Sequence, residues 1–227
     1  MTRCLYLHGF ASGPGSTKGV GFADDFAGRG LAVERLDLRV PSLEHLRLSR
    51  MIEHVLTRVG DREPCVLIGS SLGGLTAARV AERSPQVKAL VLMAPAFQLV
   101  PRWRERLGDE AWQAWASSGW LAIHDYAERR DSRVDFGFAQ DAIATDDGWP
   151  AAVVPTLIFH GTRDEAVDVE LSRAWTVRNP DTSLVELDDD HQLVASLPAI
   201  LPRAWEFLAP YVARCRRSRR RHRPAAV

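Results

Sequence analysis

The sequence has few cysteines and no pattern that suggests a metal site. Only three cysteines occur in the 227 residues, and an odd number gives no complete disulfide framework. Cys4 and Cys65 lie in strand-like apolar runs, whereas Cys215 lies in a polar tail. We interpret the first two as buried, unreactive thiols of a protein in a reducing compartment, and we expect a cytoplasmic location. No spacing of Cys or His matches a metal site, so neither a metal nor a cofactor is expected.

Long apolar runs are missing as well. No stretch approaches the roughly 20 residues that a membrane-spanning helix needs, so no transmembrane segment is predicted. The first residues enter a strand-like segment at Cys4 without the layout of a signal peptide. Two nucleotide motifs are absent: G-x-G-x-x-G does not occur, and Lys18 follows Thr17 where a Walker loop requires a glycine. The glycine-rich loop near the start of the chain is therefore not interpreted as a phosphate cradle.

The formal net charge is zero, but the charges are unevenly distributed. Residues 214–227 hold seven of the 29 basic residues and no acidic residue, which leaves 22 basic against 29 acidic residues in the rest. We divide the chain into a globular domain, 1–212, and a basic tail, 213–227, which is expected to be disordered. The acidic body argues against a nucleic-acid enzyme. A solvated extension is the simpler interpretation of the tail, and contact with an anionic surface is the alternative.

Strand-like apolar runs alternate with amphipathic segments of helix length, a pattern typical of a parallel sheet with helices on both faces. At 227 residues the chain is long enough for one well-buried α/β domain and too short for two. The expected strands cover residues 3–8, 32–36, 65–68, 89–93, 155–159 and 183–187. The sequence therefore predicts a single α/β domain with about six strands.

The connection between the fourth and fifth expected strands is unusually long. It has roughly 60 residues, whereas a parallel crossover needs only about a dozen. The surplus predicts an insertion over about 97–150, which holds five of the seven tryptophans. We interpret it as a small helical lid whose aromatic side chains line an apolar acyl pocket, namely Trp103, Trp112, Trp115 and Trp120. The alternative is that these side chains only hold the insertion to the domain.

The most informative stretch is 65–74, where four apolar residues end in a turn of small residues and a helix-forming segment follows at once. This is the strand, turn and helix that a G-x-S-x-G nucleophile elbow requires, with Ser71 at its centre. Gly69 and Gly73 have no side chains to collide across such a turn. Ser71 is therefore the candidate nucleophile; Ser70 lacks glycines at the required offsets.

A serine nucleophile needs a base, and the base needs an acid that orients it. Asp164 follows the fifth expected strand, and His191 follows the sixth. Because the carboxyl ends of parallel strands lie at one edge of a sheet, we expect both side chains to meet Ser71 there. Glu165 and Asp168 remain alternatives for the acid.

Two backbone N–H groups are candidates for the oxyanion hole that such a nucleophile needs. Leu72 directly follows the nucleophile, and Phe10 lies in the loop after the first strand. His8 and His160 precede glycines at strand ends, and we expect each to brace its loop by hydrogen bonding rather than to take the proton.

Together these motifs resemble those of the α/β-hydrolase superfamily and, within it, of small bacterial serine carboxylesterases. The likeness spans about residues 3–210 and is carried by Leu5-Tyr6-Leu7-His8-Gly9-Phe10, the loop with Lys18, the elbow 69–74, His160-Gly161-x-x-Asp164 and Asp190-His191. The resemblance implies Ser71 as nucleophile, His191 as base and Asp164 as its partner. Larger members have two further antiparallel strands before the strand that leads into the loop of the oxyanion hole, and Met1-Thr2 leaves no room for them here. An all-parallel sheet of six strands is therefore expected.

We expect a cofactor-free serine hydrolase that cleaves carboxylic esters of short to medium acyl chain through an acyl-enzyme. Its expected partner is a small-molecule ester, and no nucleic acid is required. An acyl thioesterase or a C–C bond hydrolase with the same triad is the first alternative, because fold and triad do not fix the substrate. A hydrolase-like binding protein without turnover is the second, although a pure binder has no need of all three triad residues. Nothing in the sequence argues for a particular oligomeric state.

Overall fold

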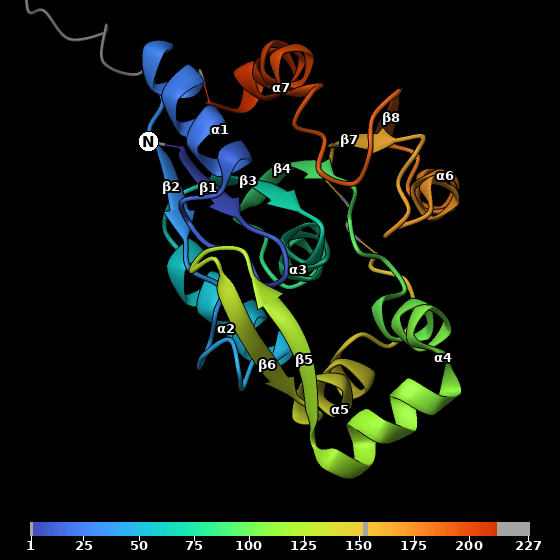
Figure 1. Ribbon diagram of the computed structural model, residues 1–227. Coiled ribbons are helices and arrows are strands. Elements are labelled where there is room, and N and C mark those ends of the chain that lie inside the picture. Colours follow the sequence, from blue (N-terminus) through green and yellow to red (C-terminus); the bar gives the residue numbers. More distant parts are fainter. Residues whose placement is uncertain (1, 152–153, 213–227) are drawn as a thin grey trace, which may run out of the picture.

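A six-stranded parallel sheet forms the centre of the computed structural model, which describes residues 2–151 and 154–212 (Figure 1). The strands lie in the order β2-β1-β3-β4-β7-β8, and all neighbours pair in parallel. Their bounds are β1 (Arg3–Leu7), β2 (Val33–Leu36), β3 (Cys65–Ser70), β4 (Val87–Met93), β7 (Thr156–Gly161) and β8 (Thr182–Leu187). The predicted α/β fold with six parallel strands is confirmed. The predicted basic tail, 213–227, lies outside the described residues.

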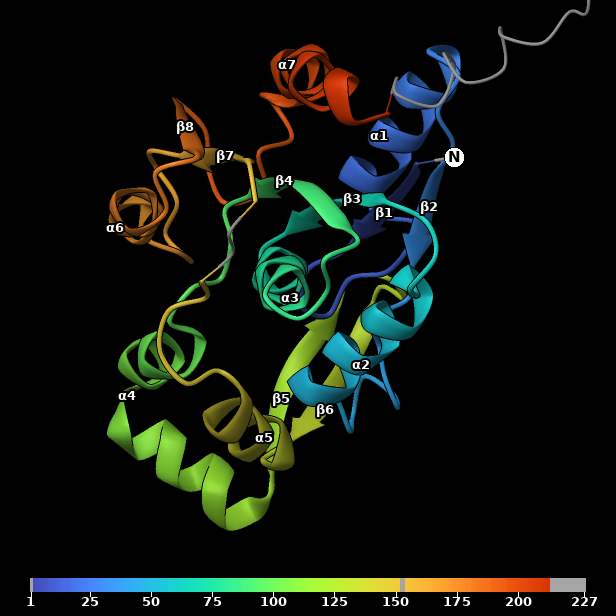
Figure 2. The same ribbon diagram turned by 180° about the vertical axis from the view of Figure 1, so that it is seen from behind.

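Helices cover both faces of this sheet (Figures 1 and 2). One face carries α1 (Thr17–Gly28) and α7 (Leu197–Val212), and the other carries α2 (Leu48–Val59), α3 (Leu72–Ala81) and α6 (Val169–Arg178). Successive side chains of a strand point to opposite faces, so Tyr6 packs in the first layer and Leu7 in the second. Because helices cover both faces, all six residues of β3 are buried, and its sequence is therefore apolar without alternation.

An insertion separates β4 from β7. It consists of α4 (Leu99–Ser118), an antiparallel hairpin of β5 (Trp120–Asp125) and β6 (Arg130–Asp135), and α5 (Gly137–Thr145). The sequence predicted a helical insertion, and the hairpin is an addition that it did not predict. Helix α4 is broken at Gly108, whose φ of 76° and ψ of 161° are not helical. None of the helices in the described ranges combines the length and the apolar character that a membrane crossing requires.

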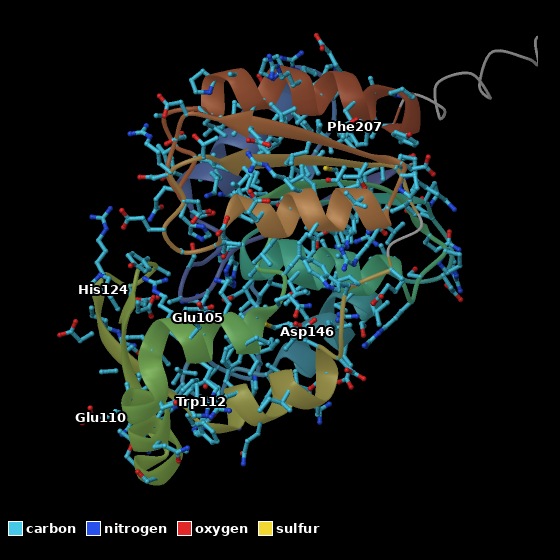
Figure 3. All side chains as sticks on the ribbon, turned by 90° about the vertical axis from the view of Figure 1, so that its right-hand side faces the viewer. Glu105, Glu110, Trp112, His124, Asp146 and Phe207 are labelled. Carbon is cyan, nitrogen blue, oxygen red and sulfur yellow. The ribbon has the colours of Figure 1, made fainter. Side chains whose placement is uncertain are left out.

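A buried ion pair ties the end of the insertion to α3. The Arg79 guanidinium donates from Nε and Nη2 to Asp146 Oδ1, at 2.9 and 2.6 Å, and from Nη2 to the carbonyl oxygen of Gly148 at 2.7 Å. The side chains of Arg79 and Asp146 are only 7% and 2% exposed, and Figure 3 shows Asp146 beside α3. Burial raises the pKa of Asp146 above its ordinary value, and the hydrogen bonds from Arg79 oppose that rise. The carboxylate therefore depends on Arg79 for its charge.

Arg79→Met is expected to lower the free energy of unfolding by about 3–5 kcal/mol at neutral pH, because it leaves a buried carboxylate unpaired. Without Arg79 the folded-state pKa of Asp146 rises further above the pKa of the unfolded state. As the pH falls, Asp146 is therefore protonated in the folded protein before it is protonated in the unfolded chain, and the loss of stability becomes smaller. Denaturant unfolding at neutral and mildly acidic pH measures both effects. Arg50→Met is the matched control: the pair of Arg50 with Glu53 is exposed, and its loss is expected to cost less than about 1 kcal/mol. Equal losses in the two variants would contradict the prediction.

Candidate active site

Ser71 stands at the sharp turn between β3 and α3. Its φ of 52° and ψ of −116° lie where residues other than glycine are rarely found. Backbone hydrogen bonds hold it there: its N–H donates to the carbonyl oxygen of Met93 at 2.9 Å, and its own carbonyl oxygen accepts from Gly74 and Ala96. Such strain persists only where the surroundings enforce it, and it is typical of functional sites. The turn presents the Ser71 side chain to the cleft described below.

The flanking glycines are required by close contacts within the elbow. A Cβ on Gly69 would collide with the carbonyl group of Gly73 and with Gly74, and one on Gly73 would collide with the carbonyl oxygen atoms of Leu7 and His8. The elbow therefore packs directly on the end of β1. This contact brings Ser71 to the loop that follows β1, where a Cβ on Gly9 would lie 3.3 Å from Ser71 Cβ.

Ser71, His191 and Asp164 form one continuous chain of hydrogen bonds. His191 Nε2 lies 3.1 Å from Ser71 Oγ, and His191 Nδ1 lies 2.7 Å from Asp164 Oδ2. The three residues come from the segments that follow β3, β8 and β7, so the structure brings together the side chains that the sequence placed at the carboxyl ends of these strands. An ionised carboxylate only accepts hydrogen bonds, so Nδ1 of His191 carries the proton and Nε2 is free to accept the serine proton.

The surroundings of Asp164 keep its carboxyl group ionised. Its side chain is fully buried, and Oδ1 accepts the N–H groups of Ala166 and Val167 at 2.8 and 2.7 Å. Oδ2 faces His191 and also lies 3.2 Å from His160 Nε2. Burial by itself would raise the pKa of Asp164, but the close His160 and His191 side chains outweigh burial and hold the pKa well below its usual range. Asp164 therefore provides a fixed negative charge to His191.

His160 braces the loop that carries this acid. The side chain is fully buried, and Nε2 donates to the carbonyl oxygen of Val167 at 2.8 Å. Nδ1 is therefore left to accept the hydroxyl proton of Ser172, at 2.7 Å. The two alternative acids make no such contact with His191: Glu165 is exposed at the cleft, and Asp168 caps α6 by accepting from the Glu170 N–H.

His8 braces the loop on the opposite side of Ser71. Its Nε2 accepts the N–H of Leu38 at 2.9 Å, so Nδ1 carries the proton and donates to the carbonyl oxygen of Gly9 at 2.8 Å. The next N–H along this loop is that of Phe10. Within residues 2–151 and 154–212, neither this N–H nor that of Leu72, the first residue of α3, has a hydrogen-bond acceptor. Both N–H groups are thus available to a ligand.

Ser71 and His191 open into a cleft of about 1100 Å³ between the sheet edge and the insertion. Apolar side chains of the first loop and the insertion are among those that line it: Phe10, Leu99, Trp103, Leu107, Leu121 and Ile123. Five basic side chains line it as well: Lys18, Arg102, Arg106, Arg129 and Arg163. The four arginines could not be recognised from the sequence, because they share no motif and come from three segments of the chain.

The four candidate pocket tryptophans do not act alike, which corrects the expectation that all line the pocket. Trp103 lines the cleft and packs edge-on against Phe10, with ring centroids 4.9 Å apart. Trp112 lies between α4 and α5 (Figure 3), and Trp115 is buried with its Nε1 donating to the carbonyl oxygen of Val134. Trp120 stacks under the Arg133 guanidinium, 3.9 Å from its ring centroid. These three pack against other residues of the insertion, so their role is a structural one, although the alternative considered from the sequence was that they hold the insertion to the domain.

The remaining candidate ligands and nucleophiles lie away from this cleft. Cys4 and Cys65 are buried free thiols on adjacent strands, and burial raises the pKa of Cys65 to about 11. Neither thiol therefore supplies a thiolate at neutral pH. In the part of the chain that the structure describes, no group of three His, Cys, Asp or Glu side chains is arranged to hold a metal ion.

Comparison with known proteins agrees with this fold. The model of a family described as uncharacterised protein family UPF0227 matches residues 3–209. A search of curated proteins found no match. Alpha/beta hydrolase domain-containing protein 10 from mouse has a similar structure, with a TM-score of 0.77 at 22% identity over 92% of this chain and 90% of that one.

Two further solved structures share the architecture. Est1E from Butyrivibrio proteoclasticus, bound to ferulic acid, has a TM-score of 0.73 at 20% identity over 92% of this chain and 90% of its own. An α/β hydrolase enzyme from the metagenome of sediments of the Mar Chica lagoon, Morocco, has a TM-score of 0.64 at 21% identity over 92% and 91%. At these identities the likeness shows the α/β-hydrolase fold, whereas the chemistry has to be argued from the site itself.

Proposed function

The chain belongs to the UPF0227 family and has the α/β-hydrolase fold, and from this premise we propose that it is a serine hydrolase that cleaves small carboxylic esters of short to medium acyl chain. One observation carries the proposal: the unbroken hydrogen-bond chain from Ser71 Oγ through His191 to Asp164, with distances of 3.1 and 2.7 Å. A nucleophile, a base in hydrogen-bond reach and an acid that orients the base are the three parts that nucleophilic acyl transfer requires.

In the first half of the reaction, Ser71 Oγ attacks the ester carbonyl carbon while His191 Nε2 accepts the hydroxyl proton. The buried charge of Asp164 stabilises the imidazolium that forms and keeps the ring oriented. The N–H groups of Phe10 and Leu72, which have no acceptor in the described protein, donate to the oxyanion of the tetrahedral intermediate. When this intermediate collapses, His191 returns the proton to the leaving alcohol and the acyl group remains on Ser71.

The second half repeats these steps with water. His191 takes a proton from the water as it attacks the acyl-enzyme, the same N–H groups bind the new oxyanion, and Ser71 leaves with the proton from His191. The acyl chain is accommodated by apolar side chains that line the cleft, including Phe10 and Trp103. The same two steps serve a thioester, so the leaving group has to be identified by experiment.

Two experiments test the proposal. The protein is labelled with a fluorophosphonate probe and the labelled peptide is located by mass spectrometry. In parallel, hydrolysis is measured for p-nitrophenyl esters of increasing chain length. Label on Ser71 with a clear optimum in chain length is the expected result, because only an activated serine reacts and only a bounded pocket selects by length. Label on Ser71 without ester turnover would move the proposal to thioesters and C–C bonds. No label in a folded sample would overturn it and favour a binding protein.

A further inference from the structure

The cleft carries more positive charge than a neutral ester requires. Its five basic side chains are accompanied by only two acidic ones among the lining residues, Glu165 and Asp190. The chain outside residues 214–227 has the opposite balance, with 22 basic against 29 acidic residues. A cleft whose charge is opposite to that of its surroundings attracts and retains ligands of the opposite sign.

Arg102, in the first turn of α4, is the most informative of these basic residues. It is half-buried at the cleft, where Nε donates to the carbonyl oxygen of Phe97 at 3.4 Å and Nη1 donates to that of Ala166. It forms no ion pair with any described residue, so most of its five N–H donors have no protein partner. Burial lowers the pKa of Arg102 to about 10; Asp164 opposes the shift, and the charge of Arg106 adds to it.

Arg106 follows Arg102 by one helical turn and lines the same cleft. Like charges four residues apart destabilise a helix, and Arg106 has no ion-pair partner in the described ranges. Arg104, between them in sequence, differs on both counts: it does not line the cleft, and it pairs with Asp109 at 3.2 Å. The cleft side of α4 thus holds two adjacent cations that form no ion pair with a described residue, and a bound anion would reduce both the repulsion and the cost of burial.

We propose that the ester substrate carries an anionic group, a carboxylate or a phosphate, which Arg102 and Arg106 bind while Ser71 attacks the ester. This inference rests on the proposed esterase function and deepens it. A guanidinium donates two parallel N–H bonds to either kind of anion, which explains why arginines occupy these positions. Lys18 has another role, because its Nζ donates to the carbonyl oxygen of Gln192 at 2.5 Å and so holds the loop that follows His191.

Matched pairs of substrates test the proposal and separate the two anions. For a carboxylate on the acyl side, p-nitrophenyl monoesters of adipic and suberic acid are compared with p-nitrophenyl hexanoate and octanoate. For phosphates on the leaving side, hexanoyl-CoA is compared with hexanoyl-N-acetylcysteamine. In at least one of the two comparisons we expect kcat/KM to be about tenfold or more higher for the anionic substrate, because a hydrogen bond to a charged group typically contributes that much to binding. Equal rates within both pairs would overturn the proposal.

Variants of α4 decide whether these arginines cause the preference. Arg106→Gln is expected to lower kcat/KM for the anionic member about tenfold and to change that of the neutral member much less. Arg106 is exposed, and Arg106→Gln breaks no hydrogen bond of the described protein. Arg102→Gln, in contrast, also removes the hydrogen bond to the carbonyl oxygen of Ala166, so Arg106→Gln is the more decisive variant. Arg104→Gln removes an equal charge from the same helix outside the cleft and should leave the preference intact. Equal losses for both members in Arg106→Gln would contradict the proposal.

The outcomes also distinguish this inference from the proposed function. Turnover of neutral esters without any anionic preference would leave the esterase in place and overturn the anion site. If no ester or thioester is turned over, the proposed function fails, and calorimetric binding of adipate against hexanoate decides the anion site alone. Adipate binding about tenfold tighter, with the difference lost in Arg106→Gln, supports the site; equal binding of the two acids overturns it.

Discussion

Ser71→Ala is expected to lower kcat/KM for p-nitrophenyl esters by about 10⁶-fold while the folded structure is retained. The substitution removes only Oγ, the atom that lies 3.1 Å from His191 Nε2. The backbone bonds that hold the elbow, from the Ser71 N–H and to its carbonyl oxygen, do not involve the side chain. Alanine also keeps the Cβ, so the positive φ of the elbow is no more strained than before. Steady-state kinetics with circular dichroism and thermal unfolding measures both parts of the prediction.

Ser70→Ala is the matched control for this experiment. Ser70 is the neighbouring hydroxyl, it is buried at the end of β3, and it lines the same cleft, but His191 forms its side-chain hydrogen bonds with Ser71 and Asp164 instead. We expect Ser70→Ala to keep most of the activity. Activity that survives in Ser71→Ala would remove Ser71 from the mechanism, and a similar loss in both variants would indicate that the elbow itself had been disturbed.

Asp164→Asn is expected to lower kcat by about 10⁴-fold, with a much smaller change in KM. The Oδ2 position accepts the N–H of His191 Nδ1 at 2.7 Å and also lies 3.2 Å from His160 Nε2. An asparagine amide nitrogen there offers its own protons, so His191 has to move its proton to Nε2 to accept one of them. In that tautomer His191 cannot take the proton of Ser71. If the amide turns the other way, its nitrogen faces the N–H groups of Ala166 and Val167 instead.

The control for Asp164→Asn is Asp168→Asn, which changes the other acid considered for this loop. Asp168 caps α6 by accepting the N–H of Glu170 at 2.9 Å, and asparagine caps a helix about as well as aspartate. We therefore expect unchanged kcat and unchanged stability in this variant. A large loss of kcat in Asp168→Asn, with little effect in Asp164→Asn, would show that Asp168 and not Asp164 is the acid that orients His191.

The parts of the site that were predictable from sequence are those with a local cause. The elbow is recognisable because a strained serine needs Gly69 and Gly73 within two residues on either side, and the structure shows the collisions that any side chain there would cause. Asp164 and His191 were placed by one topological rule, that parallel strands end at a common edge. Each inference used only a few consecutive residues and the order of the strands.

The hairpin of β5 and β6 escaped prediction for a physical reason. Most of its residues are exposed or half-buried, so its sequence has little of the apolar alternation that marks a strand packed on a core. The kink of α4 at Gly108 was also not predicted, because a glycine within a helix-forming segment does not by itself determine the angle between the two halves of the helix. The orientation of α4, and hence the face that it presents to the cleft, follows from packing between segments distant in the sequence.

The sequence by itself determined the α/β fold, six parallel strands and the three residues that form the hydrogen-bonded chain at the carboxyl edge of the sheet. Only the tertiary structure decided which tryptophan meets the cleft and that Arg102 and Arg106 bring unpaired positive charge to it. The first group depends on backbone geometry, which short motifs encode. The second group depends on how an inserted segment packs against the domain. A net charge of zero for the whole chain also gives no sign of the local excess of basic side chains in the cleft.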